Sequence, residues 1–209
     1  MSFTFDILVE INEEKPHIII PRTITAISFD MLQQLGVTDA IETITVEEGN
    51  PFYHSAGNCL IETRTGTLIL GCKNSVIPTD GSVSKIGRLA FNGCQALRKL
   101  IIPEGIEEIG YMAFAFSGIE EISIPYSVSE IGALCFALNP QLKAIDFKSG
   151  DIEIGSMAFG TCDELAQEQY PFPVDKANKL KLIIPDVVKF GEDAVYRYAI
   201  KYDIPFEEK

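Results

Sequence analysis

The sequence predicts a mainly β or α/β repeat solenoid, a right-handed superhelix of about 23-residue coils with one short parallel strand each. Two observations favour this fold class. The phrase Ile-Gly-x-x-Ala-Phe, with Cys for Ala in one copy, occurs four times at offsets of 23, 22 and 23 residues. In three places a proline precedes the isoleucine of such a phrase, or of its counterpart, by six residues. The copies begin at Ile86, Ile109, Ile131 and Ile154, and the prolines are Pro21, Pro103 and Pro125.

We expect one domain over residues 1–209, with N-terminal cap strands at 1–20 and a first coil at 21–46. Apolar and polar residues alternate from Phe3 to Ile11, which predicts a half-buried strand that covers the open edge of the stack. In the first coil, Ser28 and Leu32 replace the glycine and the phenylalanine of the phrase. Terminal repeats typically depart from the consensus in this way.

Residues 47–77 interrupt the repeat and predict an inserted β-hairpin. Two apolar, β-rich runs, 59–63 and 67–71, flank a turn at 64–66. Cys59 and Cys72 are placed symmetrically about that turn, so they would face each other if the turn is tight. The residues alone leave two alternatives for this pair, a disulfide or two free thiols.

Residues 78–162 form regular coils in this prediction. Apolar residues alternate before each proline, which predicts a strand, and the proline marks the corner where that strand ends. We expect the glycine of each phrase to supply a backbone angle that other residues avoid at the next bend. Equivalent side chains of stacked coils lie about 4.8 Å apart, so the phenylalanines of the phrase should form one buried column. They are Phe91, Phe114, Phe136 and Phe159.

The chain after the regular coils predicts an insertion and a cap. Ile154 and Phe190 are 36 residues apart, which places a surface insertion at 163–181. Residues 182–209 then form the last coil and the C-terminal cap, in which Val195 replaces the phenylalanine and residues 192–202 suit a short closing helix.

Composition and charge exclude several classes of function. A formal net charge of −13, without a local cluster of Lys and Arg, argues against binding nucleic acid or anionic lipid. No apolar run approaches the roughly 18 residues of a membrane-spanning helix, so we expect no membrane insertion. The first fifteen residues lack a basic leader and an unbroken apolar stretch, so we expect no secretory signal there, and a cytoplasmic location stays open.

Residues that could carry chemistry are few, and we expect neither catalysis nor a cofactor. The two histidines are His17 and His54, and no nucleophile-elbow, phosphate-loop or zinc-spacing motif is present. Glu108, Glu130 and Glu153 share one slot of three successive coils and would either bind a cation such as Ca²⁺ or extend separately into water. We favour the second alternative, because calcium sites usually add carbonyl ligands, and assign no metal site.

The outward side chains of the strands form the candidate partner surface, because a parallel sheet presents a regular grid of side chains on a rigid frame. These residues are Thr43, Thr45, Lys99, Ile101, Glu121, Ser123, Ala144, Asp146, Lys181 and Ile183. The partner would be a protein or a glycan. A structural or self-assembly unit, and hence a homo-oligomer, is the alternative, and a carbohydrate-active enzyme is a remote one.

The repeated strand-Ile-Pro, Ile-Gly and Ala-Phe elements resemble the BspA-type leucine-rich repeat over nearly the whole chain. The segments Asn50–Tyr53, Asn58–Glu62 and Gly71–Asn74 resemble a hairpin module found in that family, and Tyr198–Phe206 resembles its closing segment. The resemblance implies a bacterial surface or secreted protein that takes part in adhesion. A parallel β-helix is the rival architecture, but a single proline-terminated strand in each unit argues against it.

Overall fold

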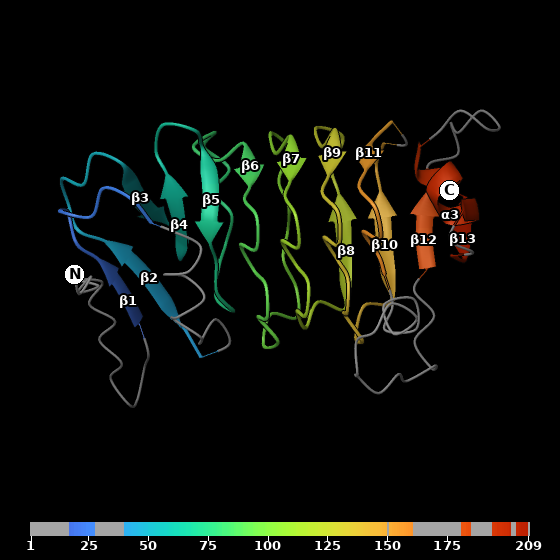
Figure 1. Cartoon of the computed structure of the whole chain (residues 1–209), viewed down its shortest axis with the longest axis horizontal. Helices are drawn as coiled ribbons and strands as arrows, with labels where there is room; N and C mark the ends of the chain where they lie inside the picture. Colours follow the sequence, from blue (N-terminus) through green and yellow to red (C-terminus); the bar gives the residue numbers. More distant parts are fainter. Residues whose placement is uncertain are drawn as a thin grey trace, which may run out of the picture.

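The computed structural model describes residues 17–27, 40–149, 151–160, 181–184, 194–201 and 204–208, which form an elongated row of short strands. At one end lie β1 (His17–Ile20) and β2 (Thr43–Val46), and at the other end lie β12 (Lys181–Ile184), α3 (Ala194–Lys201) and β13 (Phe206–Glu208) (Figure 1). The strands between them follow one another along the row in chain order, so each coil packs on the one before it.

The strands belong to three sheets. β1 pairs with β2 in parallel, and a four-stranded parallel sheet has the order β13-β12-β10-β8. A seven-stranded sheet has the order β11-β9-β7-β6-β5-β4-β3, in which β3, β4 and β5 are antiparallel and the other pairs are parallel. The remaining bounds are β3 (Tyr53–Ala56), β4 (Cys59–Glu62), β5 (Thr67–Leu70), β6 (Lys85–Ile86), β7 (Glu108–Ile109), β8 (Glu121–Ile124), β9 (Glu130–Ile131), β10 (Ala144–Phe147) and β11 (Glu153–Ile154).

Equivalent residues of successive coils are paired with each other, as the sequence period predicts. The four isoleucines of the phrase follow one another across β6, β7, β9 and β11. In the four-stranded sheet Glu121 pairs with Ala144, which pairs with Lys181. The repeat solenoid predicted from the sequence is therefore confirmed.

The sequence predicts one strand in each coil, but the number of strands varies from coil to coil. The coils that contain β8 and β10 have a second, two-residue strand at the phrase, β9 and β11, and so contribute to two sheets. Conversely, residues 97–103, which the apolar alternation predicts as a strand, are not one. Glu120 N donates to Arg98 O at 3.2 Å, but no main-chain hydrogen bond joins 99–102 to any other residue that the structure describes.

The predicted phenylalanine column is present. The rings of Phe91 and Phe114 are stacked with centroids 5.1 Å apart, and the next two steps, to Phe136 and to Phe159, measure 5.2 and 5.8 Å. All four rings are buried. The column ends at Phe159, where the ring of Tyr198 on α3 packs edge-on at 5.2 Å. Offset stacking adds to the large area that each ring buries, so this column is the centre of the core.

The glycines of the phrase serve a purpose other than the one predicted. Gly87, Gly110, Gly132 and Gly155 do not have positive φ angles. A Cβ atom on any of them would lie 2.3–2.7 Å from a backbone atom of the preceding coil, which no side chain tolerates. The close approach of two main chains, rather than an unusual backbone angle, therefore requires glycine at this slot.

The left-handed angle occurs two residues later, on large apolar residues. The φ angles of Leu89, Met112, Leu134 and Met157 lie between 51° and 61°. In the first three of these residues the backbone N–H donates to a carbonyl of the next coil, as in the 3.1 Å bond from Met112 N to Ala133 O. Left-handed backbone costs such residues about 1–2 kcal/mol each, and these hydrogen bonds between coils offset that cost.

The inserted hairpin is confirmed and separates two cores. Cys59 and Ile61 on β4 pack into the larger core with the phenylalanine column, whereas Leu60 packs into a smaller core with β1 and β2. The pairing of β4 with β5 shifts by one residue between Leu60 and Ile61. As a result Cys59 belongs to the larger core and Cys72 to the smaller, and both are free, buried thiols.

Other expectations fall wholly or partly outside the described residues. They concern the strand from Phe3 to Ile11, the substitutions at Ser28 and Leu32, and the insertion at 163–181, of which only Lys181 is described, as the first residue of β12. The closing helix expected at 192–202 is present as α3, and Val195 is buried there.

Candidate functional site

A shallow groove of about 730 Å³ lies on the four-stranded sheet and on the extended segment beside it. It crosses four coils, because its walls come from residues 99–104, from β8 and Pro125, from β10 and Lys148, and from Ile183 on β12. We call it the strand-face groove. The inward residues of the same strands, such as Ile124 and Ile145, belong to the core, so the alternation of each strand fixes which side chains face the groove.

The strand-face groove brings together seven of the ten residues of the predicted partner surface. Thr43 and Thr45 are exposed on β2, which belongs to a different sheet. The backbone of Lys181 pairs with Ala144 on β10, and its side chain lies outside what the structure describes. The seven that line the groove are Lys99, Ile101, Glu121, Ser123, Ala144, Asp146 and Ile183.

Ile101 is the most exposed apolar residue of the groove, with 84% of its surface accessible to solvent. It precedes Ile102, which is buried in the core, and Pro103, which lines the groove. Ile183 on β12 is half-buried on the same surface. The groove therefore offers separate apolar contacts near its two ends.

Charged groups of both signs line the groove, and several are already engaged. Lys148 Nζ contacts Asp146 Oδ2 at 2.8 Å. The carboxylate of Glu104 accepts hydrogen bonds from the backbone N–H groups of Tyr126 and Ser127, at 3.2 and 3.1 Å. Sequence reasoning missed Pro103, Glu104, Pro125 and Lys148, because it considered the strand positions and not the corners that follow them.

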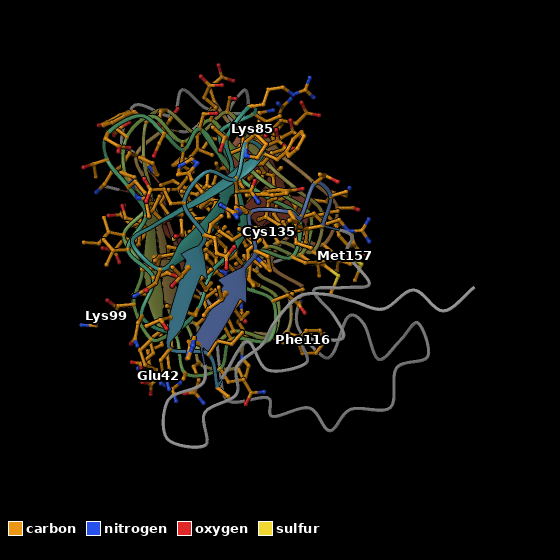
Figure 2. The ribbon with its side chains drawn as sticks, turned by 90° about the vertical axis from the view of Figure 1, so that its left-hand side faces the viewer. Glu42, Lys85, Lys99, Phe116, Cys135 and Met157 are labelled. Atoms are coloured by element: carbon orange, nitrogen blue, oxygen red, sulfur yellow. The ribbon has the colours of Figure 1, made fainter. Side chains whose placement is uncertain are left out.

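The side of the coils opposite the groove carries half-buried apolar side chains. Figure 2 shows Lys99 on one side of the molecule, Phe116 and Met157 on the other, and Cys135 between them. Phe116 and Met157 are half-buried and have left-handed backbone angles, whereas Cys135 is fully buried. Burial raises the pKa of the Cys135 thiol, so this sulfur is a neutral core group rather than a nucleophile.

The glutamate column predicted from the repeat is present. Lys85, Glu108, Glu130 and Glu153 are paired in register along the seven-stranded sheet. Lys85 Nζ lies 2.6 Å from Glu108 Oε2. This hydrogen bond, with the charges of Glu108, Glu107 and Glu130, raises the pKa of Lys85. Among the described residues, no three His, Cys, Asp or Glu side chains are arranged so that they could hold a metal ion.

The histidines do not form a catalytic arrangement with the groove. His17 is on β1, and His54 is on β3 with its Nδ1 atom 2.9 Å from Thr63 Oγ1. Neither lines the strand-face groove. Within the described part of the chain, no helix has the length and apolar character required to cross a membrane.

Comparison with known proteins identifies the repeat. Residues 70–180 match the model of the BspA type leucine rich repeat region, of which six copies are found. The chain belongs to the BspA-type leucine-rich repeat family. Members of this family are typically non-catalytic. No curated protein sequence matches the chain.

Two solved structures share the fold of this leucine-rich repeat chain. A leucine-rich repeat protein from Eubacterium ventriosum is 20% identical, with a TM-score of 0.59, over 81% of this chain and 42% of the other. The pneumococcal vaccine antigen PcpA is 16% identical, with a TM-score of 0.52, over 91% of this chain and 55% of the other. The chain thus corresponds to about half the length of these two proteins.

Proposed function

We propose that the chain is a non-catalytic recognition module that binds a protein or glycan partner through the strand-face groove. The observation that carries this proposal is the groove itself, which collects seven outward side chains from four coils on one rigid surface. A preformed surface of this kind limits the ordering cost of binding, since the strands beneath it are held by the core. The fold shared with a pneumococcal vaccine antigen supports an adhesin-like role at a bacterial surface.

A binding experiment with two groove variants tests this function. Glu121 and Ile101 are exposed, so Glu121→Lys and Ile101→Asp should fold normally and yet lose partners that the unmodified protein retains from host matrix or bacterial lysate. Ile200→Asp is the matched control, because Ile200 is an exposed isoleucine on α3, with 58% of its surface accessible. Retention of every partner by both groove variants would exclude the groove as the binding surface.

A further inference from the structure

If the strand-face groove is the binding surface, as proposed above, the charges around it indicate what kind of partner it binds. A strip of negative charge, here called the acidic edge, follows the groove on the side where β8 and β10 end. β7, β9 and β11 lie along this side in Figure 1. Its carboxylates belong to Glu104, Glu107, Glu108, Glu130, Asp151 and Glu153.

The acidic edge is only weakly neutralised by the described residues. In its register column Lys85 alone is basic, and it is already bonded to Glu108. Glu107, Glu130, Asp151 and Glu153 are exposed. Adjacent coils are about 4.8 Å apart, so the field of several like charges adds up over the neighbouring groove.

Among the side chains that the structure describes, the opposite rim of the groove supplies less positive charge than the acidic edge supplies negative charge. Lys143 pairs with Glu120 at 3.2 Å, whereas Arg98 donates to the neutral backbone oxygen of Gly118 at 3.3 Å and keeps its positive charge. Lys99 supplies a second positive charge, next to the exposed carboxylate of Glu121. Within the groove, the opposite charges of Asp146 and Lys148 form an ion pair and cancel each other. The described side chains of the groove and its two rims therefore carry a net negative charge, in agreement with the formal charge of −13 for the chain.

The floor of the groove favours a polypeptide over a sugar. None of the lining residues that the structure describes is aromatic, so these residues offer a sugar ring no flat apolar surface to lie on. Ile101 and Ile183 offer aliphatic contacts near the two ends instead.

We propose that the occupant of the strand-face groove is a cationic polypeptide segment, whose Lys or Arg side chains face the acidic edge while its aliphatic side chains contact Ile101 and Ile183. Four coils at about 4.8 Å span roughly 15 Å, the reach of about five extended residues. The carboxylates attract the segment over a distance, and the aliphatic contacts select among cationic sequences.

Three fluorescent peptides of equal length test this proposal by anisotropy. One alternates lysine with leucine, one alternates serine with leucine, and one alternates glutamate with leucine. We expect the lysine peptide to bind at least about tenfold more tightly than the serine peptide at low salt, and the difference to shrink at high salt, because the attraction is screened. The glutamate peptide should not bind. Equal binding of the lysine and serine peptides, or a preference for the glutamate peptide, would overturn the proposal.

Matched variants separate binding in the groove from general attraction to an acidic protein. Glu121→Lys and Glu130→Lys should each weaken the lysine peptide severalfold, whereas Glu48→Lys, an equal charge change in an exposed turn after β2, should have little effect. Ile101→Ser should weaken the peptide, and Ile200→Ser should not. Equal effects of Glu48→Lys and Glu121→Lys would refute the groove as the peptide site.

The proposed function and this inference can fail separately. If Ile101→Asp abolishes capture of a partner that proves to be acidic or a glycan, the groove is the binding surface and the cationic occupant is wrong. If the groove variants retain every captured partner, the proposed function is wrong as well.

Discussion

A Cβ atom on Gly71 would lie 1.9 Å from Cε1 of Phe91, so the first ring of the phenylalanine column rests directly on the main chain that follows β5. Gly71 N also donates to Ala90 O at 2.8 Å, which fixes the two segments together. We therefore expect Gly71→Ala to lower the free energy of unfolding by about 2–3 kcal/mol, measured by urea denaturation. In the background Phe91→Leu, where the ring is absent, the same change should cost much less. A cost that is equal in both backgrounds would show that the contact is not responsible.

The interior of the column should be more sensitive than any exposed aromatic residue. Phe114 is fully buried between two stacked rings, so Phe114→Ala should lower the free energy of unfolding by about 3–5 kcal/mol. Tyr126→Ala is the control, because 70% of the Tyr126 surface is exposed and its removal should change stability by less than about 0.5 kcal/mol. Similar losses in the two variants would contradict the buried column.

Glu130 lies directly between Glu108 and Glu153 in the register of the seven-stranded sheet. Like charges placed opposite each other destabilise a sheet, so Glu130→Gln should raise the free energy of unfolding by about 0.2–1 kcal/mol at low salt, and by less at high salt. Millimolar Ca²⁺ should leave the melting temperature of the unmodified protein unchanged. A Ca²⁺-dependent increase that Glu130→Gln abolishes would instead establish a cation site at this column.

The thiol of Cys59 should make stability depend on alkaline pH. Burial raises its pKa from the ordinary value of 9.0 to about 11, so the folded protein holds this proton more tightly than the unfolded chain does. Stability is therefore complete below about pH 9 and falls as the pH rises through 11, by about 2–3 kcal/mol for a shift of this size. Urea denaturation at pH 8 and at pH 10.5 should show a smaller decrease for Cys59→Ala than for the unmodified protein. Equal decreases would assign the effect to other groups.

Sequence reasoning predicted those features of the fold that arise from the same residue type recurring at the same position of each coil. The phenylalanine column and the pairing of Glu121 with Ala144 follow from spacing alone, because each coil repeats the geometry of its neighbour. The outward side of each strand follows from its period of two, which is why seven groove residues were identified.

The parts that were missed depend on the main chain. Leu89 and Met112 have left-handed angles although neither residue type favours them, because their N–H groups reach the next coil. The shift of register between Leu60 and Ile61 is equally invisible in the spacing of Cys59 and Cys72, which is symmetric about the turn. Glu104 and Lys148 were missed because the corner after a strand has no periodic signal.

Both ends of the phenylalanine column are closed, and this limits how copies of the chain can join. Phe91 is covered by Gly71, where no side chain fits, and Phe159 is covered by the ring of Tyr198. A second molecule that continued the column would have to displace Tyr198, which is 8% exposed, and uncover its aromatic surface to water. Continuation of the phenylalanine column by a second copy of the chain is thus opposed by the core itself.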